Sequence, residues 1–264
     1  MRIHVRRGGE EGKEYYVVVT LHEEYGEILA GVVDFTNRRI GIETHIKVPY
    51  LESELRIAGS SELKKTLHRI IKKHPYILTI VVHPELGITK YETTSAVREH
   101  PERVVEAGEL EGITEYAIDH SFEKSSGDTL RYLARTRLET FLADIRILRF
   151  RVDKNDLYEK LRYTGKKVEL FISRTFTLRT IFKNTMEAVP PRAHRVIWRE
   201  GGAMVAHVLT RHTTKLSQGI YAKVGDTRTN IYGIEGGEVR FFDYFPWGKN
   251  NLYEAIGGFM GVGK

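Results

Sequence analysis

The sequence predicts an α/β protein in which two β-β-β-α units flank a module of a different pattern. The first observation is the order of apolar segments over residues 15–82, which read as three strands, a helix and a strand. The second is the return of three strands and a helix from residue 219 onward. The third is a long helical pattern over residues 112–142, followed by strand patterns. Changes between period 2 and period 3.6 separate strands from helices.

The first unit begins with three segments in which apolar residues alternate or cluster, as in half-buried strands. They are residues 15–21, 27–35 and 39–48. A helix follows, with Ser60 or Ser61 as its cap and four apolar residues on one face. These are Leu63, Leu67, Ile70 and Ile71. Residues 76–82 form a buried type of strand, and residues 87–93 form another.

The middle of the chain reads as a strand, a helix and two strands. The helix covers residues 112–142, with Thr114 as a plausible N-cap, and the strands cover residues 144–152 and 166–176. We expect this compact module at 93–165, set inside the first unit. A helix over 177–189, a strand over 194–198 and a helix over 199–211 come next. Pro190 and Pro191 stop the first of these helices.

The second unit repeats the order of the first. Residues 219–224, 229–234 and 238–245 read as strands, and a helix begins at Asn250. Two such units at opposite ends of one chain suggest an internal structural duplication.

Composition excludes several classes of protein. The chain of 264 residues has 41% apolar residues and no cysteine, so it can bury a core but has no disulfide or cysteine-bound metal. No apolar run approaches the roughly 20 residues of a membrane-spanning helix, and residues 1–16 lack the apolar segment of a signal peptide. We therefore expect a soluble, cytoplasmic protein. The charge of +6 fits a mixed-charge surface, and no basic run is interleaved with aromatics as a groove for single-stranded nucleic acid requires.

Residues 221–256 contain a Gly/Thr-rich turn between two strands, a kind of turn whose backbone N–H groups bind phosphate. A carboxylate normally stands nearby to hold the metal ion. Here Lys223 stands two residues before the turn glycine, Gly225. Ordinary strand turns explain Gly225, Gly236 and Gly237 as well as phosphate contact does. Lys223 either extends from a strand edge into solvent or binds phosphate as a point charge. The eleven histidines show no metal spacing, and no catalytic residue stands out.

These elements and motifs resemble the actin-like ATPases, and within them the bacterial division protein FtsA and its relative PilM. FtsA-type proteins carry a strand ending in Asp-x-Gly, a Gly/Thr turn, a Thr-Asp pair, a hairpin and a Pro-x-Gly-Gly close. The corresponding segments here are Lys223-Val224-Gly225, Asp226-Thr227-Arg228, Thr229-Asn230, Glu235-Gly236-Gly237 and Pro246-Trp247-Gly248-Lys249.

The resemblance implies an actin-like (ribonuclease H-like) fold with an inserted strand-helix-strand-strand (SHS2-type) subdomain. It divides the chain into 1–92 as the first part of actin-like domain 1 and 93–165 as the inserted subdomain. Residues 166–216 would complete domain 1, and 217–264 would start domain 2. It also implies ATP and magnesium as cofactors, bound at a nucleotide site. The site residues carried over are Lys223, Gly225, Asp226, Thr227, Thr229, Asn230 and Gly248.

For function, the resemblance implies a cell-division scaffold of the divisome that self-associates into oligomers. It would link an FtsZ-like division protein to the inner face of the cell membrane, as a cytoplasmic, peripherally membrane-associated protein. One alternative is a pilus-assembly adaptor of PilM type. Another is an enzyme such as a sugar kinase, which needs a carboxylate base and both phosphate loops.

The sequence departs from the family pattern in three places. Lys223 replaces the aspartate, and Thr20-Leu21-His22-Glu23 replaces the first Asp-x-Gly-Ser/Thr loop, leaving Glu23 or Glu24 as the nearest carboxylates. The adenine-binding segment and the membrane-anchoring helix would lie beyond residue 264, in a truncated or a naturally reduced protein. We expect at most weak ATPase activity, and more specifically no measurable hydrolysis, no Mg²⁺-dependent nucleotide binding and at most weak phosphate binding at residues 225–229.

Overall fold

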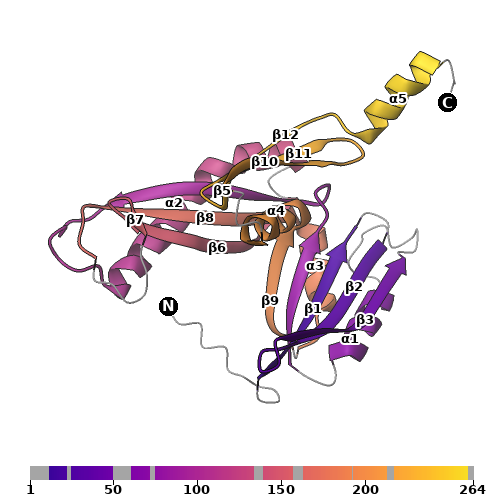
Figure 1. The fold of residues 1–264 in the computed structure, drawn as a ribbon, viewed down its shortest axis with the longest axis horizontal. Helices are drawn as coiled ribbons and strands as arrows, with labels where there is room; N and C mark the ends of the chain where they lie inside the picture. Colours follow the sequence, from indigo (N-terminus) through magenta and orange to yellow (C-terminus); the bar gives the residue numbers. More distant parts are fainter. Residues whose placement is uncertain are drawn as a thin grey trace.

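The computed structural model describes residues 12–22, 25–49, 61–71, 75–133, 139–156, 163–191, 193–212 and 217–260. The expectations for the N-terminal lead-in, Ser60, Glu23 and Glu24 lie outside these residues. The described chain forms three sheets with helices packed between and beside them (Figure 1).

The first sheet has five strands in the order β3-β2-β1-β4-β9. β1 to β3 form an antiparallel meander, whereas β4 and β9 run parallel to β1. The strands are β1 (Lys13–Leu21), β2 (Tyr25–Asp34), β3 (Arg39–Pro49), β4 (Tyr76–Val82) and β9 (Ala193–Glu200). In β1 every second side chain is buried, which is the period-2 pattern that the sequence showed.

Two helices cover the core of this sheet. α1 (Ser61–Ile71) buries Leu63, Leu67 and Ile71 beside the β1 and β4 side chains. α3 (Arg179–Ala188) packs on α1 and ends with extended backbone at Val189, directly before Pro190. The predicted stop is therefore confirmed, because the residue before a proline disfavours helical geometry.

The second sheet has four strands in the order β5-β8-β6-β7, with helix α2 beside it. Its elements are β5 (Gly87–Val97), α2 (Ala107–Leu133), β6 (Thr140–Val152), β7 (Asn155–Asp156) and β8 (Lys167–Leu178). β8 lies between β5 and β6, so strands from both sides of the expected 93–165 segment meet in one sheet. This sheet is separate from the first (Figure 1).

Two predictions for this region were wrong. α2 begins at Ala107, so Thr114 lies inside the helix and is not its cap. Residues 140–142 belong to β6, because Thr140 pairs with Leu178 and the Phe141 ring packs on Phe182 at 4.1 Å between centroids. Pairing with a strand distant in sequence overrides a pattern that is also compatible with a helix.

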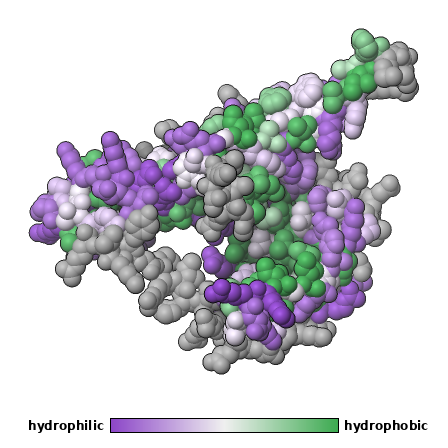
Figure 2. Space-filling model, in the orientation of Figure 1, coloured by the Kyte–Doolittle hydropathy of each residue, from purple (hydrophilic) through white to green (hydrophobic). Residues whose placement is uncertain are grey.

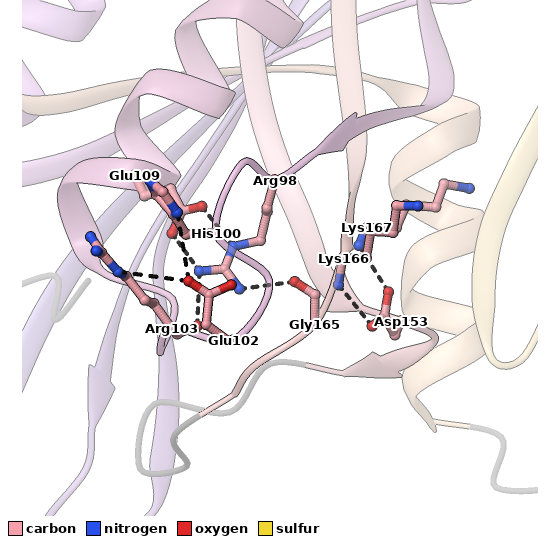
Figure 3. Close-up of polar contacts among 9 residues, drawn as sticks. All are labelled: Arg98, His100, Glu102, Arg103, Glu109, Asp153, Gly165, Lys166 and Lys167. Carbon is pink, nitrogen blue, oxygen red and sulfur yellow. Dashed lines mark hydrogen bonds and ion pairs between the residues drawn. The ribbon is translucent and has the colours of Figure 1, made fainter.

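A buried arginine fixes the start of α2 (Figure 3). The Arg98 side chain is 1% exposed, and its guanidinium donates two hydrogen bonds to the Glu109 carboxylate, at 2.6 and 2.9 Å. It also donates to the carbonyl oxygens of Gly165 and Arg103, at 2.9 and 3.0 Å. The contacts join three segments of this sheet's outer end, and the bidentate geometry makes the ion pair strong.

The third sheet is an antiparallel meander in the order β10-β11-β12. Its strands are β10 (Gln218–Val224), β11 (Thr229–Glu235) and β12 (Glu238–Phe245). Gly236 and Gly237 have φ values of 61° and 72°, so this two-residue turn uses conformations that favour glycine. α4 (Gly201–His212) packs against β11 and β12, and β12 also contacts β5.

The last described helix, α5 (Lys249–Met260), extends away from the rest of the molecule (Figure 1). Its apolar side chains are exposed, with Tyr253 at 65% and Phe259 at 94%. Figure 2 shows this green helix at one end and a mostly hydrophilic surface at the opposite end, over the second sheet. None of the described helices combines the length and the apolar character that crossing a membrane would require.

Candidate functional site

The candidate site lies at the edge of the first sheet where β1, β4 and β9 end. Because these three strands are parallel, their carboxyl ends share one edge, which is where α/β sheets commonly place a ligand site. The edge carries His22 after β1, His83 and Glu85 after β4, and Glu200 at the end of β9. The turn between β10 and β11 lies against it, since Glu85 contacts both Thr227 and Arg228.

The backbone of the 225–228 turn bonds within the protein. The Gly225 N–H donates to the Arg228 carbonyl at 2.8 Å. The carbonyl oxygens of Gly225 and Asp226 accept from the N–H groups of Lys249 and Asn250, at 2.9 and 3.0 Å. The first N–H groups of α5, which at many helix starts bind an anion, are therefore used to hold the turn.

Gly248 makes this packing possible. A Cβ at this position would lie 2.5 Å from the Asp226 carbonyl oxygen and 2.7 Å from that of Gly225. Any other residue would therefore push α5 away from the turn. The Thr229 hydroxyl donates to the Trp247 carbonyl at 2.8 Å and fixes the same approach from the other side.

The Glu85 carboxylate occupies the outer side of the turn. The Thr227 hydroxyl donates to its two oxygens at 3.1 and 3.3 Å, and Arg228 Nη2 donates to Oε2 at 2.7 Å. Both charged side chains are largely buried, with 13% of Glu85 and 15% of Arg228 exposed. A Cβ built on Gly225 would lie 3.4 Å from Glu85 Oε1. A carboxylate of the protein itself thus sits at the turn that the sequence suggested for phosphate.

Lys223 points toward the same edge from β10. It is half-buried, and its Nζ would lie 3.8 Å from a Cβ placed on Gly201. Burial lowers the pKa of Lys223, while the charge of Glu200 acts in the opposite direction. Lys223 is therefore not an exposed residue of a strand edge. Among the described residues, no carboxylate accepts a hydrogen bond from its ammonium group.

The two histidines of the edge are neutral at pH 7. Burial, together with the charge of Lys223, lowers the pKa of His83 to about 4. Burial also lowers the pKa of His22, whose ring centroid lies 5.4 Å from that of His83. Within the described parts of the chain, His83 Nδ1 and His22 Nε2 are buried and have no hydrogen-bond partner. The end of β1 thus presents the His22 imidazole at the place where the family pattern has its first Asp-x-Gly-Ser/Thr loop.

Glu200 is a structural cap at the centre of the edge. Its carboxylate is fully buried and accepts from the N–H groups of Gly202 and Ala203, at 2.7 and 2.8 Å, and from the Tyr232 hydroxyl at 2.7 Å. Burial raises the pKa of Glu200, and these three hydrogen bonds oppose the increase. A Cβ on Gly202 would lie 2.1 Å from the Tyr232 oxygen, so only glycine admits this contact.

The residues that the resemblance assigned to a nucleotide site lie in one corner of the molecule, but their side chains face in different directions. Thr229 and Asn230 are 3% and 1% exposed and point into the protein. Asp226 is exposed, with Lys249 Nζ at 3.4 Å from its carboxylate. Residues Lys223, Gly225, Thr227 and Gly248 surround the turn as described above.

Sequence reasoning missed Glu85, His83 and Glu200 as members of this corner. Glu200 had a visible signal, since an acidic residue followed by Gly201-Gly202 at a helix start is a capping pattern. Glu85 had none, because its partner Arg228 lies 143 residues away in the chain.

These residues do not fit a magnesium-bound nucleotide phosphate. The two carboxylates at the turn already face cations, Glu85 with Arg228 and Asp226 with Lys249, and the nearby Lys223 ammonium repels a metal cation. Three or more metal-ligating side chains do not cluster anywhere in the described residues.

Comparisons with known proteins agree with the observed topology. No family model matches the chain, and no curated protein sequence matches it. Among solved structures, the PilM chain of the PilM–PilN type IV pilus biogenesis complex is similar, with a TM-score of 0.51 and 11% identity over 94% of this chain. The chain spans 66% of the length of that PilM chain, slightly less than two thirds.

Two further structures are similar to a lower degree. A Bacteroides thetaiotaomicron protein described as having an actin-like ATPase fold and unknown function has a TM-score of 0.47 and 12% identity, over 96% of this chain and 78% of its own. A Ppx/GppA family member from Aquifex aeolicus has a TM-score of 0.42 and 8% identity, over 92% of this chain and 54% of its own. The similarity to PilM confirms the actin-like α/β fold of the prediction, whereas the inserted strand-helix-strand-strand subdomain stays a prediction.

Proposed function

We propose that this protein is an actin-like scaffold that acts through protein contacts and not through nucleotide turnover. The observation that carries the proposal is the Glu85 carboxylate on the 225–228 turn, where it bonds Thr227 and Arg228. An ATP phosphate and this carboxylate would compete for the same donors. At the end of β1, Thr20-Leu21-His22-Glu23 stands where the family pattern has Asp-x-Gly-Ser/Thr, so the glycine of the second cradle that a nucleotide would need is missing as well.

An enzyme of the sugar-kinase type is disfavoured by the same corner. A general base must reach its substrate proton with a lone pair available. Glu200 is fully buried and already accepts three hydrogen bonds, and Glu85 is held by Arg228. We propose that MgATP binds weakly or not at all, and that only a small anion binds weakly near Gly225.

As the partner we propose a PilN-type protein of a pilus or secretion assembly. The support is the similarity to PilM, which is found in a complex with PilN. The chain would then be cytoplasmic and would associate with the inner membrane face through its partner. The division-scaffold alternative, with an FtsZ-like partner, rests on the same fold and differs only in the protein that is bound.

We also propose that residues 93–165, which contain α2, β6 and β7, form the inserted subdomain, and that β5 and β8 join it to domain 1 through the same sheet. Self-association would use this part of the molecule. Its outer end carries the rigid Arg98–Glu109 contact, which gives α2 a fixed position for binding another protein.

Co-purification tests the proposed partner. A tagged chain expressed in its native host should retain a pilus- or secretion-assembly protein, identified by mass spectrometry, with and without MgATP in the wash. Equal retention under both conditions is expected. Recovery of an FtsZ-like protein would assign the division alternative, and retention that requires MgATP would overturn the nucleotide-independent mechanism.

Isothermal titration with MgATP tests the site directly. The expected result is no saturable heat in the micromolar range. Micromolar binding that is lost in Lys223→Ala would overturn the proposal, because it would make Lys223 part of a working nucleotide site.

A further inference from the structure

A separate cavity lies where the three sheets meet. Its volume is about 110 Å³, and it lies between the second sheet, the first turns of α4 and the start of β12. Tyr91, Ser173 and Arg146 line it from the sheet, and Arg199, Ala203 and Glu238 line it from the opposite side. One water molecule needs about 10–15 Å³, so the cavity has room for several waters or one small solute.

The cavity wall contains a buried cationic donor that the protein leaves unused. The Arg199 side chain is 15% exposed, and its Nη1 donates to Asp144 Oδ2 at 2.5 Å and to the Trp198 carbonyl at 2.6 Å. Its Nη2 is buried and has no hydrogen-bond partner among the described residues. Since Arg199 lines the cavity and an unsatisfied donor on a buried charged group is costly, a small rotation of its guanidinium would give Nη2 a hydrogen bond to an acceptor held in the cavity.

The remaining lining favours an anion as that acceptor. Arg146 supplies a second guanidinium, and Tyr91 and Ser173 supply hydroxyl groups. Glu238 is the carboxylate of the lining, and it is paired with Arg149 and, at 3.3 Å, with Arg240. Arg199 is paired with Asp144, so the excess of positive charge at the cavity comes from Arg146 and from the two arginines that share Glu238.

We propose that this cavity binds a small oxyanion, either a phosphate or a small carboxylate. The anion would accept hydrogen bonds from Arg199 Nη2 and from the hydroxyl groups, with Arg146 adding charge attraction. The volume admits a phosphate or a short dicarboxylate but not a nucleotide. The site is distinct from the 225–228 turn, and it does not depend on the function proposed above.

Binding of inorganic phosphate and of succinate tests this site. Thermal unfolding and isothermal titration would be run at constant ionic strength, with sodium chloride replaced by the probe, so that general charge screening stays fixed. We expect saturable binding of at least one probe. Arg146→Gln should weaken it about tenfold or more, because a charge-assisted contact is lost.

Two further variants separate the cavity from general surface charge. Leu148→Trp places bulk at the cavity without breaking an ion pair, and it should abolish binding. Arg151→Gln is the matched control, because it removes one arginine from the same strand at a position outside the cavity, where the side chain bonds Asp156. It should bind like the unchanged protein.

The outcomes are decisive in both directions. Binding of phosphate alone or of succinate alone supports the site and identifies the geometry it prefers. No saturable binding in the millimolar range overturns the proposal. So does an equal loss in Arg146→Gln and Arg151→Gln, which would indicate non-specific attraction.

Discussion

The two β-hairpins at equivalent places in the two β-β-β-α units have become different kinds of structure. In the first, β1 ends at His22, whose N–H donates to the Tyr25 carbonyl at 2.9 Å and whose ring stacks on Tyr25. In the second, Gly225 donates to Arg228 at 2.8 Å and the turn is closed from outside by Glu85. The sequence of the first turn, residues 22–25, contains no glycine, and the second turn has Gly225 but uses its donors internally.

The comparison separates two ways in which a turn can fail to offer a phosphate cradle. In the first, the sequence of the turn has no glycine that would allow close backbone approach. In the second, Gly225 is present, but the Glu85 carboxylate, from the turn between β4 and β5, bonds the Thr227 and Arg228 side chains. Removing the Glu85 side chain would undo the second arrangement, so the difference between the two turns can be tested by substitution.

The largest expected effect is the loss of stability when Glu200 is replaced, because this residue lies at the sheet edge between the two hairpins. Glu200→Ala removes a buried acceptor from two N–H groups and from the Tyr232 hydroxyl, so we expect a loss of about 3 kcal/mol or more in the free energy of unfolding. Urea unfolding measures it, with the exposed Glu187→Ala as control. A loss below about 1 kcal/mol would mean that these contacts contribute little.

Glu85→Ala should reopen the second turn. Removing the carboxylate takes the acceptor from the Thr227 hydroxyl and the negative charge from beside Arg228, and we expect phosphate to bind near Gly225 about tenfold more tightly than to the unchanged protein. The partly buried ion pair is lost at the same time, at a cost of about 1 kcal/mol. Titration with phosphate measures the affinity.

The control for Glu85→Ala is Glu235→Ala, which removes an exposed carboxylate from the far end of the same hairpin. It should leave phosphate affinity unchanged. An equal gain in both variants would show that net charge, and not release of the turn, controls the affinity.

His83 should make the molecule less stable in mild acid. Its pKa is about 4 in the folded protein, against the ordinary 6.5 of an exposed imidazole, so the unfolded chain binds the proton more readily between these values. Stability from this group is complete above about pH 6.5 and is lost as the pH falls toward 4.

After discounting for solvent screening of a group that is partly exposed, we expect about 1 kcal/mol from this effect between pH 7 and pH 5. Urea unfolding at the two pH values should show a smaller difference in His83→Gln than in the unchanged protein. An identical pH dependence in the two proteins would mean that His83 titrates normally when folded.

The smallest effect concerns Lys223, whose charge depresses the pKa of both histidines. Lys223→Met keeps the chain length of the side chain and removes the charge, so the pKa of His83 should rise. NMR titration of the imidazole signals measures the change, and the exposed Lys183→Met on α3 provides the control. An unchanged His83 pKa would place the Lys223 ammonium farther from the edge than the structure has it.

The sequence by itself determined the local elements of this protein. Alternating burial in β1, the apolar face of α1 and the glycine turn at Gly236-Gly237 all follow from residues a few positions apart. Such patterns carry their own periodicity, and the order of these elements, with the motifs of residues 219–256, carried the resemblance that implied an actin-like fold. The Gly225 and Gly248 positions were likewise visible, because close backbone packing requires glycine.

Tertiary structure alone decided what these elements do. The strand at residues 140–142 formed because β8 lay beside it, and Thr140 gives no local sign of that pairing. The decisive contact at the site joins Glu85 to Arg228 across 143 residues, and each residue alone looks like an ordinary loop or turn residue. A carboxylate's partner depends on which charge the fold brings within a few ångströms of it, because electrostatic attraction follows distance in space and not in sequence.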